Sequence, residues 1–154
     1  MKKLLVAVFV ACLILGTGTA AACDCICPRG KAALVNADVA FSGKVIKIKY
    51  LDNQEQTNAE PRIIVAFRVY RIWKGKSKRK IVLHTVFNKW TCNGYQFKEG
   101  EEYLVFAHVN GAEAAKMFPQ AKRTWGVSTC GGTFLLADAQ KDIKELGAGR
   151  RDLR

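Results

Sequence analysis

Three cysteines fall within a five-residue stretch of this 154-residue chain, at Cys23, Cys25 and Cys27. Cys92 and Cys130 lie far from them, and neither has the neighbouring cysteine or histidine that a zinc site requires. The Cys-x-Cys spacing also differs from the Cys-x-x-Cys of thioredoxin-like redox sites. We therefore expect two long-range disulfides that tie the N-terminal segment to the regions of Cys92 and Cys130, with one cysteine left over.

No pattern in the sequence indicates catalysis. His84 and His108 are the two histidines, and both lie within predicted strands, where we expect them to be side chains of a barrel wall rather than metal ligands. The chain has no His-Glu-x-x-His motif, nucleophile elbow, phosphate-binding loop or evident pair of acids. The sequence predicts a protein that is not an enzyme, needs no cofactor and has no metal site of its own.

The second candidate site is a dense run of positive charge. Five cations fall within seven residues, at Lys74, Lys76, Lys78, Arg79 and Lys80. Arg150, Arg151 and Arg154 add to this charge from the C-terminal tail. Such a cluster can bind anionic polymers of a cell surface or matrix, or it can be a solvated turn that aids solubility. The sequence leaves both interpretations open.

The first 22 residues have the pattern of a signal peptide. Met1-Lys2-Lys3 is followed by an apolar run from Leu4 to Leu15 and by the small residues before Cys23. Cleavage there removes Cys12 and two lysines, which lowers the formal net charge from +12 to +10. We expect a secreted protein with a single domain, residues 23–154. The alternative is a cell-surface lipoprotein, attached to a membrane only if Cys23 is lipidated.

The hydrophobic pattern predicts the elements that position these residues. Alternating apolar residues indicate strands at 39–49, 62–73, 81–87 and 102–109, and a shorter one at 123–129. Gly43 indicates a bend or bulge in the first strand. Helical turns are expected at 31–37 and a helix at 138–146, capped by Asp138 and ended by Gly147. These elements predict a mainly β fold, a five-stranded OB-like barrel, because a β-sandwich usually has about seven strands.

Aromatic residues on an OB barrel can stack on the bases of a nucleic acid. The candidates here are Trp73, Trp90, Trp125 and Tyr95. Because the chain begins with an export signal, we expect them to pack in the core and in loops instead. No nucleic acid is expected as a partner.

Several motifs occur in an order that is similar to a known family. They are Cys-x-Cys directly after the signal peptide, residues 37–45, Trp73-Lys74-Gly75, residues 92–97, residues 100–107, residues 129–133 with Leu136, and a final helix ending at Leu146-Gly147. Together they resemble the netrin-like domain of the tissue inhibitors of metalloproteinases (TIMPs), in particular the short single-domain bacterial members. The resemblance covers nearly all of residues 23–154.

The resemblance implies a disulfide-linked five-stranded OB barrel and a specific pairing of cysteines. Cys23 would pair with Cys92 and Cys25 with Cys130, while Cys27 has no counterpart. A shifted scheme, with Cys25 and Cys27 paired with Cys92 and Cys130, remains open and would suit a lipidated Cys23.

The family also implies an activity, inhibition of zinc metalloproteases. The α-amino group and carbonyl of Cys23 would chelate the zinc of the protease, which keeps an open coordination position. Asp24 would enter the specificity pocket, and Cys25 would belong to the same contact ridge. The sequence thus predicts a metalloprotease inhibitor, with polyanion binding by the basic turn as the alternative.

Overall fold

The computed structural model describes residues 25–51, 61–76, 78–88, 93–121 and 123–151. The predicted signal peptide lies outside these ranges, as do Cys23, Asp24, Trp90, Cys92 and Arg154. The strands are β1 (Val39–Tyr50), β2 (Arg62–Lys74), β3 (Lys80–Asn88), β4 (Asn93–Gly94), β5 (Glu102–Val109), β6 (Trp125–Gly126) and β7 (Phe134–Leu135). The helices are α2 (Gly30–Asn36), α3 (Ala112–Lys116) and α4 (Gln140–Leu146). In this part of the chain, no helix combines the length and apolar character needed to cross a bilayer.

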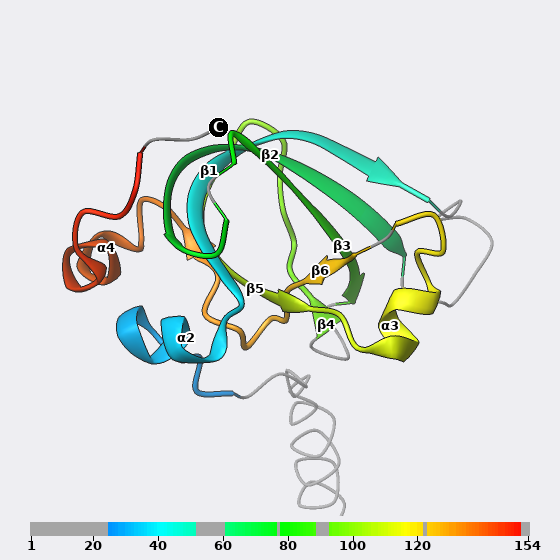
Figure 1. Ribbon diagram of the computed structural model, residues 1–154, viewed down its shortest axis with the longest axis horizontal. Helices are drawn as coiled ribbons and strands as arrows, with labels where there is room; N and C mark the ends of the chain where they lie inside the picture. The colour runs from blue at the N-terminus through cyan, green and yellow to red at the C-terminus, as the bar shows by residue number, and fades with distance from the viewer. Residues whose placement is uncertain (1–24, 52–60, 77, 89–92, 122, 152–154) are drawn as a thin grey trace, which may run out of the picture.

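The strands form one antiparallel sheet that curls into a nearly closed barrel of five strands (Figure 1). Their order is β4-β3-β2-β1-β5-β6, and β7 pairs with β5 outside this path. Helices α2 and α4 lie together on one side of the barrel, and α3 lies on the other (Figure 1). The predicted mainly β fold with a five-stranded barrel is confirmed.

The barrel closes through side chains rather than through a continuous strand ladder. Across the seam between β3–β4 and the segment around β6, the Thr85 hydroxyl donates to the Val127 carbonyl at 3.4 Å. The Asn110 amide donates to the His84 carbonyl at 2.9 Å, and the Thr129 hydroxyl donates to the Gly94 carbonyl at 2.8 Å. These bonds give carbonyl groups hydrogen-bond partners across the seam.

Alternation along the strands fills the barrel with apolar side chains. On β2, Ile63, Val65, Phe67 and Val69 are all buried, which agrees with the face expected from the sequence. Phe67 makes edge-on contacts with the rings of Phe41 and Phe97, at centroid distances of 5.2 and 5.3 Å. A second apolar cluster, under α2 and α4, contains Ala33, Ala37, Ala40, Leu104, Phe106 and Ala139. It attaches both helices to the outside of the barrel.

The bounds of the four long strands agree closely with the sequence pattern. The fifth strand, predicted at 123–129, is limited to Trp125–Gly126. The strand register shifts at Gly43, where a Cβ atom would lie 2.5 Å from the Arg68 carbonyl oxygen, so the predicted bulge is confirmed. Helix α4 ends at Gly147, as expected. It begins after Ala139 without a side-chain cap, so the prediction that Asp138 caps it is wrong. The short elements α3, β4 and β7 were not predicted from the sequence.

Candidate functional site

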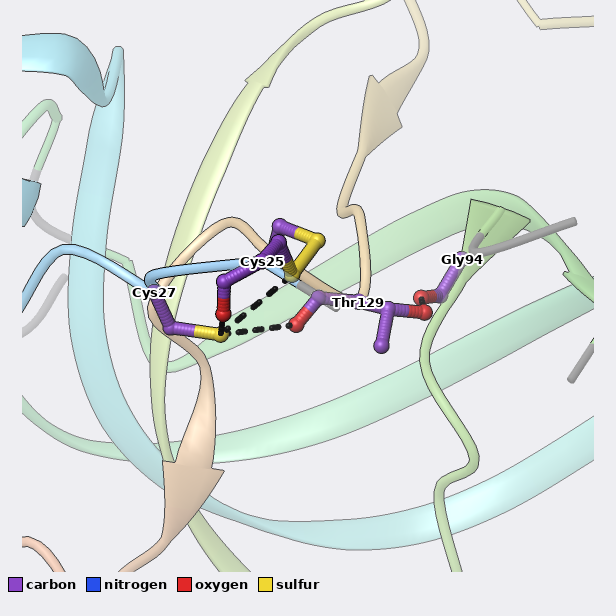
Figure 2. The surroundings of a disulfide bond; sticks show 5 residues. Cys25, Cys27, Gly94 and Thr129 are labelled. Carbon is purple, nitrogen blue, oxygen red and sulfur yellow. Dashed lines mark hydrogen bonds between the residues drawn. A yellow bond between two sulfur atoms is a disulfide. The ribbon is translucent and has the colours of Figure 1, made fainter. Parts of the chain in front are cut away.

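A disulfide fixes the N-terminal segment to the loop after β6. Cys25 is bonded to Cys130, 105 positions along the chain, with their Cα atoms 6.0 Å apart (Figure 2). Gly132, in the same loop, has a φ of +83°, and a Cβ atom there would lie 2.5 Å from the Pro28 carbonyl oxygen. The loop therefore needs glycine both for its backbone conformation and for its close approach to the segment.

An ion pair between an exposed arginine and a buried aspartate fixes the same segment a few residues later. Arg29 Nη2 lies 2.6 Å from Asp142 Oδ2 of α4, and Arg29 Nε donates to both carboxylate oxygens at 3.2 Å. The guanidinium also stacks on the Phe134 ring, 4.0 Å from its centroid. The hydrogen bonds from Arg29 lower the pKa of the Asp142 carboxyl, although burial acts in the opposite direction. Residues 25–29 are thus held at both ends.

Between these two attachments the chain exposes a large apolar side chain. Ile26 is 99% exposed, whereas the backbone on either side of it is fixed by the disulfide and by Arg29. An isoleucine in this position contributes nothing to the core of the isolated chain. A rigid segment with an exposed apolar side chain can bind a partner without a large loss of conformational entropy.

Cys27 carries a free thiol beside the disulfide. Its Sγ atom lies 3.8 Å from Cys25 Sγ and 3.6 Å from the Thr129 carbonyl oxygen (Figure 2). The structure therefore contains the Cys25–Cys130 pair that the resemblance implies. It differs from the shifted scheme, in which Cys27 would itself be part of a disulfide. The proposed partners Cys23 and Cys92 lie outside the described residues.

The basic turn joins β2 to β3, and its cations have different surroundings. Lys74 donates from Nζ to the carbonyls of Leu34 and Val35, both at 3.1 Å, and so caps the last turn of α2. The other four, Lys76, Lys78, Arg79 and Lys80, are exposed. Lys74 therefore has a structural role that the sequence did not indicate.

Two further features extend the positive charge around this turn. The backbone of Arg150 pairs with Ile72 of β2, and its guanidinium donates to the Gly75 carbonyl, so the C-terminal tail lies against the turn. On the outer face of the sheet, Lys44 pairs with Arg68, and Arg68 pairs with Lys80. The cations of the turn therefore continue as a row across three strands.

The aromatic candidates for base stacking that the structure describes make contacts within the protein. Trp73 donates from Nε1 to the Gly147 carbonyl at 2.9 Å, and the Trp125 ring lies under the Arg123 guanidinium. Tyr95 packs against the Phe97 ring at a centroid distance of 5.0 Å. Within the described ranges, no three histidine, cysteine or acidic side chains gather in a way that could hold a metal ion.

Sequence reasoning missed Arg29, Asp142 and Ile26. The ion pair joins residues 113 positions apart, so no local pattern indicates it. The sequence could have indicated that Ile26 is exposed. It is an apolar residue between two cysteines, outside any predicted element, and has no evident place in a core. Comparison of the sequence with known proteins found no matching family model and no matching curated protein.

Proposed function

We propose that this protein is a TIMP-like inhibitor of zinc metalloproteases that acts through the N-terminus of its mature chain. The observation that carries the proposal is the tethered, partly exposed segment at residues 25–29. The Cys25–Cys130 disulfide and the Arg29–Asp142 pair hold its backbone, and Ile26 is presented to solvent. An inhibitor of this kind needs such a preordered contact ridge, because ordering a flexible segment on binding weakens affinity.

The proposed chemistry uses the two atoms at the new N-terminus. After cleavage before Cys23, its free α-amino group and carbonyl oxygen would chelate the zinc of the protease. Asp24 would enter the specificity pocket, and Cys25 and Ile26 would contact its rim. The chain holds no metal of its own in this mechanism, since the zinc belongs to the partner.

The decisive experiment compares two forms of the mature chain against a panel of zinc metalloendopeptidases, using a fluorogenic peptide substrate. One form begins with a free Cys23, and the other carries an acetyl group on that amine. We expect inhibition by the free form and its loss on acetylation. Equal inhibition by the two forms, or none by the free form across the panel, would refute the proposal.

Two substitutions sharpen this test. Ile26→Asp removes an exposed apolar contact without touching the core, and we expect it to weaken inhibition about tenfold or more while the fold is unchanged. Asp24→Ala should strengthen inhibition, because a carboxylate without a partner is costly to bury in an apolar pocket. The matched control is Lys76→Gln in the basic turn, which should inhibit as well as the parent protein.

The second candidate function is binding of an anionic polymer by the basic turn. It is favoured by the position of the Arg150 guanidinium, which lies at the Gly75 carbonyl beside four exposed cations. Cations that lie close together attract a polyanion, and added salt screens this attraction and shortens its range. Lys74 would contribute less than its position in the sequence suggests, since its ammonium group caps α2.

Elution from a heparin column measures this directly. The triple variant Lys76→Gln, Lys78→Gln, Lys80→Gln should elute at clearly lower salt than the parent protein. The control changes the same amount of charge elsewhere, through Lys98→Gln, Lys141→Gln and Lys144→Gln, which are also exposed. If both triple variants elute at the same salt, retention reflects net charge alone and the turn is not a binding site.

A further inference from the structure

The outer face of the barrel has a groove beside α3. Lys49 of β1, Ile64 of β2 and His84 of β3 lie in one row, because Lys49 pairs with Ile64 and Ile64 pairs with His84. Residues 117–121, which follow α3, form the facing wall. The groove between them has a volume of about 470 Å³. Helix α3, which precedes the facing wall, lies on the opposite side of the barrel from α2 and α4 (Figure 1).

The facing wall is held in place by specific contacts. Arg62 of β2 donates from Nη1 to the Met117 carbonyl at 2.9 Å. Phe118 is only 4% exposed, and its ring meets the His84 ring edge-on at a centroid distance of 5.5 Å. The Ala121 amide donates to the Phe118 carbonyl at 3.0 Å, which closes a tight turn. The groove is therefore preformed, as small-molecule sites usually are.

The lining combines apolar surface with positive charge. Its apolar members are Leu51, Ile64, Met117, Phe118, Pro119 and Ala121. Lys49 supplies an exposed cation, and no acidic residue occurs among the lining residues that the structure describes. Such a site attracts an anion, and its apolar wall favours an anion with an apolar body.

His84, which lines the groove, carries a buried polar atom. Its Nδ1 is buried and finds no hydrogen-bond partner among the described residues. Such orphan polar atoms are rare in proteins and are costly when buried. Burial also lowers the pKa of His84, so the ring is neutral at neutral pH and can either accept or donate at Nδ1. A ligand in the groove would meet this atom only if the ring turned, because the atom has almost no exposed surface.

We propose that this groove binds a small amphipathic anion, with a compact apolar or aromatic body and one carboxylate or sulfonate group. The body would pack on Ile64 and on the exposed side chain of Met117, and the anionic group would pair with the Lys49 ammonium. The volume lies near the lower end of the 300–1,000 Å³ typical of ligand pockets, which restricts the body to about three rings. The site is independent of the inhibitory ridge and of the basic turn.

Two fluorescent probes with the same ring skeleton test the charge requirement. One is 8-anilinonaphthalene-1-sulfonate, an aromatic sulfonate, and the other is N-phenyl-1-naphthylamine, its neutral counterpart. We expect the folded protein to bind the sulfonate saturably at one site, with an affinity that falls as salt is raised. The neutral probe should bind several-fold more weakly. Equal affinity for the two probes would overturn the proposal.

Substitutions then locate the site. Lys49→Gln should weaken binding of the sulfonate about tenfold, because it removes a charge-assisted contact. Lys47→Gln is the matched control, since Lys47 is exposed on the same strand and does not line the groove. Ala121→Trp should abolish binding by filling the groove, with the fold checked by circular dichroism.

Each outcome of these measurements either supports or refutes the proposed site. Selective loss in Lys49→Gln together with loss in a folded Ala121→Trp supports the site. Equal weakening by Lys49→Gln and Lys47→Gln indicates general charge attraction and refutes it. Unchanged binding in Ala121→Trp places the probe elsewhere and refutes it as well. If Ala121→Trp fails to fold, the comparison of the two lysine variants still separates these results.

Discussion

At the scale of single residues, the Arg29–Asp142 pair is the contact that most clearly joins the N-terminal segment to the rest of the domain. Asp142 is 3% exposed, whereas the Arg29 side chain is about half exposed. We expect Asp142→Asn to lower the free energy of unfolding by about 2 kcal/mol at pH 7, because it weakens hydrogen bonds to a charged group. Urea denaturation measures the change. Asp138→Asn is the control, since its side chain is exposed.

The same pair gives a pH dependence with a defined sign. Arg29 binds the carboxylate form, so the pKa of Asp142 in the folded protein lies below its ordinary value of about 4. The stabilisation is therefore complete above that ordinary value and is lost as the pH falls through the lowered pKa. The difference in stability between the parent protein and Asp142→Asn should shrink at pH 3 and below. An unchanged difference there would show that the charge is not responsible.

A second prediction at this scale concerns the Cys27 thiol. Its Sγ lies 3.8 Å from Cys25 Sγ, close enough for attack after a small movement. Attack by the thiolate would form a Cys25–Cys27 bond and release Cys130 as a thiolate, with no net oxidation. We expect alkylation and peptide mapping of the folded protein to find part of Cys130 modified. Cys27→Ser should prevent it; equal modification in that variant would indicate another attacking thiol.

At the scale of elements, the approach of the N-terminal segment to the loop after β6 depends on Gly132. Gly132→Ala combines an unfavourable φ with a clash against the Pro28 carbonyl, whereas Gly100→Ala has a similar φ and open space around it. We expect Gly100→Ala to cost about 1 kcal/mol and Gly132→Ala at least about 2 kcal/mol of unfolding free energy. Thermal denaturation compares the two. Equal losses would mean that the segment moves aside at little cost.

The sequence predicted the long strands to within about a residue, for a reason that lies in their environment. Each has one face in the barrel core, so alternation is imposed along its length, as Ile63 to Val69 of β2 illustrate. Gly43 indicated the bulge in β1 for a similar reason, because a glycine within such a strand has no side chain to pack. The short β4 and β7 have no periodicity of their own and exist through pairing with distant strands.

The candidate site was less predictable than the fold. Cysteine spacing indicated that the N-terminal segment would be tethered, and the Cys25–Cys130 disulfide agrees with that expectation. The role of Lys74 as a cap for α2 and the groove beside α3 were not visible in the sequence. Both depend on elements that meet only after folding. Lys74 and Leu34, for example, are 40 positions apart in the chain.

At the scale of the whole molecule, closure of the barrel depends on a few side chains at the seam. Thr129 donates to the Gly94 carbonyl across the seam, whereas the buried Thr124 hydroxyl, nearby in sequence, has no hydrogen-bond partner among the described residues. These two threonines allow the same substitution to be made with and without loss of a seam bond.

Thr129→Val should lower the free energy of unfolding by about 1 kcal/mol and should speed hydrogen exchange of amides beside the seam, in β4 and β6. Exchange in the β1–β2 ladder should be little affected, because those amides are protected by strand pairing far from the substitution. Thr124→Val should be neutral or slightly stabilising, since it removes a buried hydroxyl that makes no bond. If the two variants lose the same stability, the seam hydrogen bond does not hold the barrel closed, and apolar packing between β3 and β6 does.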